Sequence, residues 1–412
     1  KGVDPEFGEA PRYAIYFCGN SLGLMSKRVR KYVDEECDKW KKLGVEGHFN
    51  GQRPWAMIDE PVTEKLVDIV GAKNSSEIAV MNSLSCNLHM LLTSFYRPTQ
   101  RRYKIIMEDA AFCSDHHVLQ SQVRLRGLDP KETIVALKPK PGKHTLDTED
   151  ILRAIEREGD AIALVFLGGV QYYTGQFYDL KAISAQGRKV GATVGVDLAH
   201  AVGNVSLSLH DWGIDFAAWC TYKYLNSGPG AIGGIFVHEK HHSKTGDMAI
   251  MAGWWGQTPK TRFRMSHHWE GLEGAQAWQV SNPAVLPTVC LEASLDIFRE
   301  AGGMKSIRRK SLLLTGLLEY LIRHRIDDNL AKIITPSDPE RRGCQLSLLT
   351  SSPVKPVHAK LERNGVIVDV REPNVIRLAP APLYNTFMEV YRFVDILKTA
   401  LEEEAKNIKA KL

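Results

Sequence analysis

One lysine and one aspartate stand where two apolar segments end. Lys223 follows the apolar segment 216–220 and precedes a glycine-rich run at 227–234, and Asp197 closes an earlier apolar segment at 192–197. A lysine amine can form a Schiff base with the aldehyde of pyridoxal phosphate, and an aspartate can keep the pyridinium nitrogen of that cofactor protonated. Alone, either residue is usually a surface or capping residue. The two in this order, followed by glycines, favour a pyridoxal-phosphate site.

A phosphate site is predicted at a helix start. Leu84 and Ser85 follow the strand-like segment 78–81 and precede a helical segment. Backbone N–H groups at a helix start, together with the Ser85 hydroxyl, can hold a phosphate. Ordinary N-capping by Ser83 or Ser85 is the alternative. Because Lys223 is also present, the phosphate interpretation is favoured.

Three further side chains could contact the cofactor ring. Phe112 follows the strand-like segment 103–107 and could stack on a planar cofactor, while Asp115 could contact the polar edge of the ring. A buried aromatic and a turn aspartate are the alternative. His200, three residues after Asp197, could hydrogen-bond the cofactor or orient the aspartate, or it could be a structural histidine.

Arg377 and a few aromatic residues are candidates for the substrate. Arg377 lies in the apolar segment 375–380, where an arginine is costly unless it is paired, and a substrate carboxylate would pair with it through two hydrogen bonds. An internal salt bridge is the alternative. Tyr222, beside the lysine, could bind phosphate or donate a proton. Trp254 and Trp255 could line a pocket for an aromatic substrate or pack in a core.

Composition argues against several other classes. The 412 residues carry 53 basic and 48 acidic side chains without a long run of either sign, so no nucleic-acid partner is expected. Seven scattered cysteines without a C-x-x-C pair indicate a reduced, cytoplasmic protein without disulfides or a zinc site. Adjacent histidine pairs point in different directions, so no metal site is predicted from them. No apolar run could cross a bilayer, so we expect no membrane partner.

Apolar strand-like segments alternate with helical segments over the first two thirds of the chain. This alternation predicts an α/β fold with a mostly parallel sheet wrapped by helices. After about residue 283, long helices and fewer strands predict a smaller α+β domain, with strands at 345–349, 366–370 and 375–378. The predicted division is an N-terminal segment and helix at 1–59 that contributes to the small domain, a large cofactor-binding domain at 60–282 and a small C-terminal domain at 283–412.

The chain resembles kynureninase, a fold-type-I pyridoxal-phosphate enzyme of the aspartate-aminotransferase superfamily, over nearly its whole length. The motifs that carry the resemblance are YFCGNSLG at 16–23, RPW at 53–55, DLAHAVGN at 197–204, HDWG at 210–213, YKYLN at 222–226 and RLAP at 377–380. The resemblance implies hydrolysis of kynurenine or 3-hydroxykynurenine at the Cβ–Cγ bond, giving an anthranilate and alanine in tryptophan catabolism and NAD biosynthesis.

The resemblance also assigns roles to individual residues. It implies that Lys223, Tyr222 and Asp197 are catalytic. The implied cofactor-binding residues are Leu84, Ser85, Phe112, Cys113, Ser114, Asp115, Gly168, Asp197, His200, Tyr222, Lys223, Trp254 and Asn282. The implied substrate-binding residues are Ser21, His48, Trp255, Asn282 and Arg377. Trp254 and Asn282 would complete the site of a neighbouring subunit, which implies a homodimer. Because His48 and Asn282 could hydrogen-bond a ring hydroxyl, 3-hydroxykynurenine is the expected preferred substrate.

Two other functions fit parts of the sequence. A cysteine desulfurase or selenocysteine lyase of the same superfamily would need a mobile nucleophilic cysteine, and Cys344 is the candidate by position. Cys344 directly precedes a strand-like segment, so burial is the expectation. The other alternative is a non-catalytic homologue that binds pyridoxal phosphate or a partner. The presence of both Lys223 and Arg377 argues against it.

Overall fold

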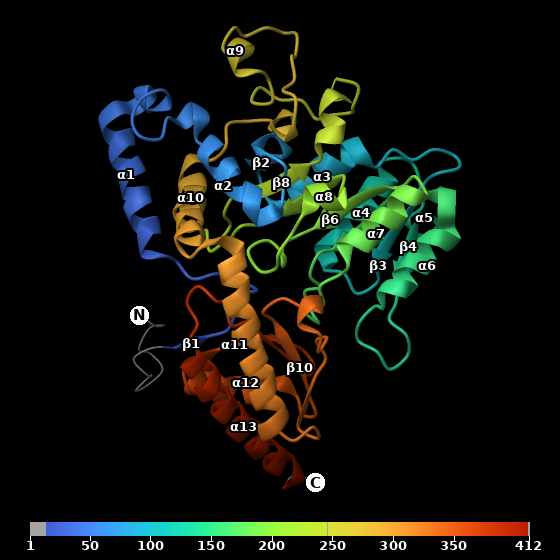
Figure 1. Cartoon of the computed structure of the whole chain (residues 1–412), viewed down its shortest axis with the longest axis vertical. Helices are drawn as coiled ribbons and strands as arrows, with labels where there is room; N and C mark the ends of the chain where they lie inside the picture. Colours follow the sequence, from blue (N-terminus) through green and yellow to red (C-terminus); the bar gives the residue numbers. More distant parts are fainter. Residues whose placement is uncertain (1–13, 245, 411–412) are drawn as a thin grey trace.

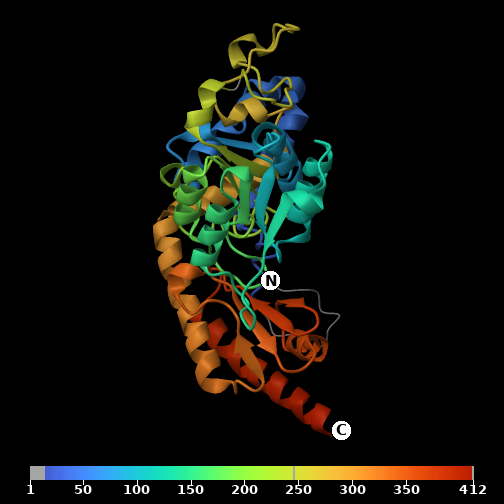
Figure 2. The ribbon, with the colours of Figure 1, turned by 90° about the vertical axis from the view of Figure 1, so that its right-hand side faces the viewer.

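The computed structural model describes residues 14–244 and 246–410. Figures 1 and 2 show a larger part that contains the long mixed sheet, and a smaller part below it that ends at the C-terminus. Helix α11 (Gly303–Arg325) runs from the larger part into the smaller one. No helix among the described residues is long and apolar enough to cross a membrane.

A seven-stranded sheet forms the centre of the larger part. Its strands, in spatial order, are β2 (Ile78–Met81), β8 (Gly233–Val237), β7 (Phe216–Trp219), β6 (Thr193–Asp197), β5 (Ile162–Gly168), β3 (Lys104–Glu108) and β4 (Ile134–Leu137). Only β8 runs antiparallel to its neighbours, and the other pairings are parallel. The α/β fold with a mostly parallel sheet is therefore confirmed. The central strands are apolar throughout because both faces of the sheet are covered.

Helices cover both faces of this sheet and form two cores. One core joins the sheet to residues of α2, α6, α7 and α10, and the other joins it to residues of α3 and α4. The bounds are α2 (Glu60–Val70), α3 (Leu84–Phe95), α4 (Cys113–Arg124), α5 (Pro130–Thr133), α6 (Thr148–Glu158), α7 (Leu180–Lys189), α8 (Leu209–Trp212), α9 (Pro259–Arg262) and α10 (Val285–Glu300).

The smaller part is built on a second sheet with its own core. This sheet has the order β12 (Asp369–Arg371), β13 (Val375–Leu378), β10 (Leu346–Thr350) and β9 (Ala331–Ile333), and its pairings are antiparallel. Its core includes residues of α11, α12 (Val354–Arg363) and α13 (Phe387–Lys409). The single strand predicted at 366–370 is wrong: β11 (Val366–Ile367) pairs with β1 (Ile15–Tyr16), whereas β12 belongs to the four-stranded sheet.

The first described residues belong to the smaller part. Ile15 and Phe17 pack in its core, and the chain then crosses to helix α1 (Lys27–Leu43). The Ser26 hydroxyl caps this helix by accepting a hydrogen bond from the Val29 N–H. The segment between β1 and α1 therefore passes between the two parts, where it can supply residues to a site.

Candidate active site

A cavity of about 310 Å³ opens where the carboxyl ends of the large sheet meet the smaller part. Ligand sites of α/β proteins form at this edge of the sheet. Asp197 is the last residue of β6, Gly168 is the last of β5, and Lys223 follows β7. The lining residues are Asn20, Ser21, Ser83, Leu84, Ser85, Glu108, Ala111, Phe112, Ser114, Asp115, Gly168, Val170, Gln171, Tyr172, Asp197, Ala199, His200, Tyr222, Lys223, Arg371 and Arg377.

Two buried carboxyl groups lie beside the lysine. Asp197 accepts a hydrogen bond of 2.7 Å at Oδ1 from the Ala199 N–H. Burial raises the pKa of Asp197, while that hydrogen bond and the charge of Lys223 oppose the rise. Burial and the neighbouring Asp197 raise the pKa of Asp115 well above its ordinary value. We infer that Asp115 holds the proton of this pair and that Asp197 is the carboxylate.

Two helix starts face the cavity from one side. Leu84 and Ser85 begin α3, and Ser114 lies in the first turn of α4. The hydroxyls of Ser85 and Ser114 lie 2.7 Å apart. Ser83 is the N-cap residue of α3, but its side chain makes no capping hydrogen bond. The first-turn N–H groups of α3 and this hydroxyl pair are what a phosphate requires.

The cavity holds polar atoms that are buried and lack a partner. Asp115 Oδ1 and His200 Nδ1 make no hydrogen bond within the described residues. Burial and then the charge of Lys223 lower the pKa of His200 well below its ordinary value, so its ring is neutral. Buried polar atoms without partners are rare in proteins and call for a ligand or an ordered water. Together with Lys223 and the two helix starts, these atoms fit pyridoxal phosphate.

Arg377 lies in β13 of the smaller part, and several partners hold its side chain. It is 1% exposed. Its Nε donates to Asp369 Oδ1 at 2.9 Å, and its Nη1 donates to the Tyr172 carbonyl at 2.7 Å. Its Nη2 forms an ion pair with Asp369 Oδ2 at 2.5 Å. A weaker contact of 3.3 Å joins Nη2 to the Ser21 hydroxyl. The internal salt bridge that was the alternative is therefore present, yet Arg377 still lines the cavity.

Several predicted site residues lie outside the cavity of this chain. Trp254 is 41% exposed, and its Nε1 donates to the Arg262 carbonyl, while Trp255 is buried under the Arg262 guanidinium. The other three are His48, Asn282 and the exposed Cys113. The remaining predicted residues lie together around the cavity: Ser21, Leu84, Ser85, Phe112, Ser114, Asp115, Gly168, Asp197, His200, Tyr222, Lys223 and Arg377.

The sequence did not reveal some residues that line the cavity or hold a lining residue in place. Asp369, which holds Arg377, faces it directly across the antiparallel pair β12–β13. A hairpin prediction for 369–377 would have paired the two residues. Glu108 at the end of β3 and Tyr172, whose ring meets Phe112 edge-on at 5.3 Å, carried no distinguishing sequence signal.

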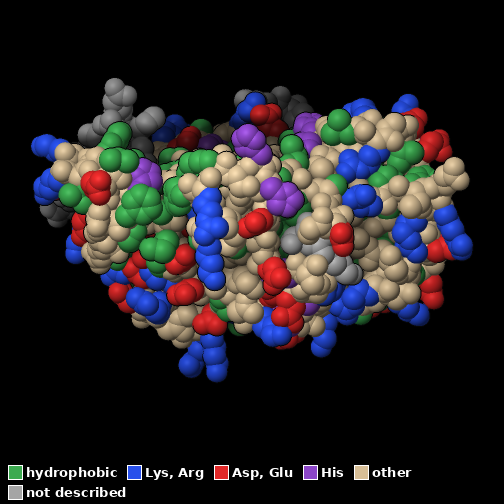
Figure 3. Space-filling model, turned by 90° about the horizontal axis from the view of Figure 1, so that it is seen from above, with side chains coloured by type: hydrophobic (Ala, Val, Ile, Leu, Met, Phe, Trp, Pro, Cys, Tyr) green, Lys and Arg blue, Asp and Glu red, His purple; other side chains and the backbone are tan. Residues whose placement is uncertain are grey.

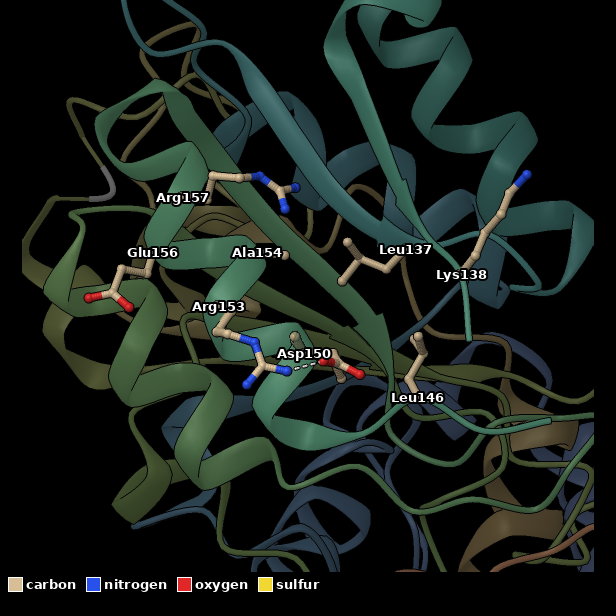
Figure 4. A pocket seen from close by; sticks show the side chains of 9 residues that line it. Leu137, Lys138, Leu146, Asp150, Arg153, Ala154, Glu156 and Arg157 are labelled. Carbon is tan, nitrogen blue, oxygen red and sulfur yellow. Dashed lines mark hydrogen bonds and ion pairs between the residues drawn. The ribbon is translucent and has the colours of Figure 1, made fainter. Parts of the chain in front are cut away.

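A second hollow lies elsewhere on the molecule. Figure 4 shows it between α6 and the end of β4, with a volume of about 540 Å³. Leu137 and Leu146 form its apolar part, and Asp150 pairs with Arg153 in it. Because Asp150 is paired with Arg153 and the other charged groups lie at the protein surface, we assign it no chemistry.

Solved structures with similar backbones include a C–S lyase variant with a covalently linked pyridoxal-phosphate cofactor. A cysteine desulfurase from Thermococcus onnurineus NA1 matches with a TM-score of 0.79 over 95% of both chains, at 18% identity. A cystine C–S lyase matches with a TM-score of 0.77 over 94% of this chain and 98% of that chain, at 17% identity. The chain thus has the fold of the fold-type-I pyridoxal-phosphate enzymes.

Sequence comparison identifies the family within this class. Residues 307–397 match the model of the kynureninase C-terminal domain. Human kynureninase is 50% identical over 413 residues, which cover 98% of this chain and 88% of the relative. Kynureninase of Myxococcus xanthus is 50% identical over 384 residues, which cover 93% of this chain and 89% of the relative. The chain belongs to the kynureninase family, and this identity favours kynureninase over the desulfurase alternative.

Proposed function

We propose that this chain hydrolyses kynurenine or 3-hydroxykynurenine at the Cβ–Cγ bond, releasing an anthranilate and alanine, with pyridoxal phosphate as its cofactor. The carrying observation is that Lys223, Asp197 and Arg377 open onto one cavity, although they lie far apart in the sequence. The relatives that are about 50% identical to this chain are named kynureninase. These two observations agree on an amino-acid substrate whose carboxylate meets an arginine.

Several residues would hold the cofactor. When bound, pyridoxal phosphate supplies an electron sink for bonds at the substrate's α- and β-carbons. Asp197 would pair with its ring nitrogen, and Asp115 and His200 have the free polar atoms to meet its oxygen substituents. The first turn of α3, with Ser85, would hold its phosphate. Phe112 would cover the ring.

Lys223 and Tyr222 are the proposed proton carriers. The Lys223 amine takes the proton from the substrate α-carbon. A water then adds to the side-chain ketone, the Cβ–Cγ bond breaks, the anthranilate leaves with the water's oxygen in its carboxyl group, and the β-carbon takes up a proton. Burial raises the pKa of Tyr222, so its phenol stays protonated and can donate that proton. Its ring centre lies 5.9 Å from Lys223 Nζ.

Arg377 would bind the substrate α-carboxylate. Asp369 and the Tyr172 carbonyl fix its guanidinium plane, and the contact with the Ser21 hydroxyl is the weakest of its interactions. An incoming carboxylate can therefore accept a hydrogen bond from the remaining Nη1–H and displace the Ser21 hydroxyl from Nη2. Fixing the amino acid at its carboxylate orients the α-C–H bond toward Lys223.

A second copy of the chain would complete the site. His48, Trp254, Trp255 and Asn282 lie outside the single-chain cavity, although the family resemblance gives them cofactor or substrate contacts. Exposed aromatic side chains lie near Trp254, one of these four residues. The Phe263 ring lies 5.7 Å from Phe49 and 5.6 Å from Trp254. Figure 3 views the molecule from the end that carries α9, and it shows hydrophobic side chains gathered on one side of that end. An exposed apolar patch of this kind fits a homodimer contact.

The proposed preference for 3-hydroxykynurenine rests on His48 and Asn282. His48 Nδ1 lies 3.0 Å from the Val45 carbonyl, so Nδ1 carries the proton and Nε2 is free to accept a hydrogen bond from a phenol. Asn282 Oδ1 has no partner within the described residues. A ratio of kcat/KM for the two substrates above unity in favour of the hydroxylated one is expected, and a ratio of one or less would refute the preference.

The experiment that tests the proposed function is an activity assay on the protein loaded with pyridoxal phosphate. Each kynurenine is added, and anthranilate or 3-hydroxyanthranilate is followed by fluorescence, with alanine measured as the second product. We expect stoichiometric formation of both products, and none with Lys223→Ala. Release of sulfide from cysteine without anthranilate formation would overturn the proposal, as would cofactor binding without turnover of either kynurenine.

A further inference from the structure

Glu77, His210 and His238 converge at the opposite end of β2 from the active site. Glu77 directly precedes β2, whereas Ser83 and Ser85 follow it, so the strand of four residues, about 13 Å long, separates the two places. His210 lies in α8, and His238 follows β8. Figure 1 shows α8 beside β2 and β8. None of these three residues has a part in the chemistry derived above.

The donor atoms of the three side chains meet at one carboxylate oxygen. His210 Nδ1 lies 2.9 Å and His238 Nδ1 lies 3.6 Å from Glu77 Oε1. One donor atom from each of the three residues lies within 4.8 Å of the others. The two imidazole rings lie nearly side by side, with centroids 4.6 Å apart and planes 32° apart. Both rings therefore point their Nδ1 atoms toward the Glu77 carboxylate.

Hydrogen bonding explains only part of this arrangement. His210 Nδ1–H donates to Glu77 Oε1, which also accepts from the Glu239 N–H at 2.8 Å. The 3.6 Å contact with His238 is too long for a hydrogen bond. His238 Nδ1 instead accepts a 3.2 Å hydrogen bond from the Lys240 N–H, so this nitrogen carries no proton that could join it to Glu77. Two acceptors, this nitrogen and the Glu77 carboxylate oxygen, lie 3.6 Å apart with no proton between them and repel each other, and a cation that replaced the Lys240 N–H as the partner of Nδ1 would relieve this repulsion.

The distances suit a tetrahedral metal ion. Zinc binds histidine nitrogen at about 2.0–2.1 Å and carboxylate oxygen at about 2.0–2.2 Å, so neighbouring ligand atoms in a tetrahedral site lie about 3.3 Å apart. The observed separations of 2.9 and 3.6 Å fall on either side of that value. We propose that Glu77, His210 and His238 form a binding site for a divalent transition metal of the zinc type, remote from the active site.

The surroundings of the cluster support a neutral, ligating histidine pair. Because the Lys240 N–H donates to His238 Nδ1, the proton of the neutral ring lies on Nε2, and Nδ1 can exchange this N–H for a metal ion. On metal binding, the His210 proton moves from Nδ1 to Nε2, with no net change in protons. Nε2 lies 3.9 Å from Glu239 Oε1, so a carboxylate stands beside the ring nitrogen that then carries the proton. Carboxylate–histidine–metal arrangements of this kind fix the tautomer of the ligand.

The site would connect three chain segments. Glu77 belongs to the connection between α2 and β2, His210 to α8, and His238 to the end of the antiparallel strand β8. His210 and His238 have side chains 21% and 12% exposed, so water can reach the fourth coordination position. Because the metal would bind the folded chain and tie these segments together, its role would be to stabilise this edge of the large sheet.

Cobalt(II) binding to the protein loaded with pyridoxal phosphate tests the proposal. Titration calorimetry is combined with the ligand-field absorbance of Co²⁺, which reports tetrahedral nitrogen and oxygen ligands. We expect one saturable site, a higher unfolding temperature with metal, and displacement by Zn²⁺. His238→Gln should weaken the binding by roughly 100-fold or more, since loss of a ligand exceeds the effect of losing a supporting residue. His144→Gln, a change at an exposed histidine elsewhere, should leave it intact.

Several outcomes would overturn the metal site. These are the absence of saturable Co²⁺ binding, binding of equal affinity in His238→Gln, or intense thiolate-to-metal charge-transfer bands, which would place the ion on exposed Cys37, Cys86 or Cys113. Glu77 is left unchanged because it also holds the Lys73 and Glu239 N–H groups. His210→Gln serves as the second ligand variant, and the unfolding temperature without metal confirms that each variant is folded. Binding that survives in both folded variants would refute the site.

Discussion

Asp369 holds Arg377 through a hydrogen bond and an ion pair across neighbouring strands. The two residues face each other in the β12–β13 register, and Asp369 Oδ2 also accepts from the Ser21 hydroxyl at 2.6 Å. Burial alone would raise the pKa of Asp369, but Arg377, together with the Ser21 hydroxyl and Arg371, outweighs burial and lowers the pKa. Asp369 therefore stays ionised, and the guanidinium of Arg377 keeps one orientation toward the cavity.

Arg377→Lys removes the fixed guanidinium plane. We expect KM for the kynurenines to rise by roughly 10- to 100-fold, since a charge-assisted hydrogen bond contributes about 1.5–3 kcal/mol. Asp369→Asn keeps the shape but removes the charge, so a smaller rise in KM is expected, with kcat reduced less. Steady-state kinetics check both variants, and an unchanged KM in Arg377→Lys would contradict the role of this arginine.

Burial raises the pKa of Glu108, in the cavity wall, to about 7. An unfolded glutamate titrates near 4.3, so the raised folded pKa stabilises the protein most below that value. This contribution is lost as the pH rises to about 7. Glu108→Gln resembles the protonated acid, so this variant should not lose stability over this pH range. Its free energy of unfolding should rise by up to about 3 kcal/mol relative to that of the natural chain between pH 4.5 and 7.5. Denaturant unfolding across that range measures the difference, and parallel curves would refute the protonated state.

Cys344 separates the kynureninase mechanism from the desulfurase one. It is fully buried, and burial raises its pKa to about 12, so it is no thiolate at neutral pH. Cys344→Ala should therefore keep its kynurenine turnover. If the variant folds, binds the cofactor and loses turnover, the cysteine has a role that the proposed mechanism lacks.

Mixed dimers test the contribution of a second subunit. Lys223→Ala and Asn282→Ala should each be inactive or strongly impaired alone. If Asn282 completes the neighbour's site, unfolding and refolding them together should restore activity, because each mixed dimer has one site with both residues intact. Light scattering gives the mass of the species formed. No restoration in verified mixed dimers would contradict the shared site.

The sequence predicted the large sheet well because its strands are apolar runs with both faces buried. The prediction from sequence failed where the structure of a segment depends on its surroundings in the fold and not on its own residue pattern. Helix α4 begins at Cys113 with polar residues and shows little amphipathic pattern, so only its position after β3 reveals it. The split of 366–370 between two sheets depends on partners at Ile15 and in β13, which no local pattern contains.

The residues of the candidate site likewise divide into those that the sequence could predict and those that it could not. Lys223, Asp197 and Arg377 could be predicted because each is a charged residue in an apolar segment, where only a function or a partner accounts for it. Asp369 and Glu108 became visible only once the strands were paired. The Glu77, His210 and His238 cluster could not be predicted, because its members come from three separate segments and match no metal-ligand spacing.

The most direct test of the central claim is to find which amine carries the cofactor. The protein loaded with pyridoxal phosphate is reduced with borohydride, which makes the link between cofactor and amine permanent, then digested and analysed by mass spectrometry. The account predicts one pyridoxyl group, on the peptide that contains Lys223. Labelling of a different lysine, or a protein that binds the cofactor without any link to Lys223, would contradict it.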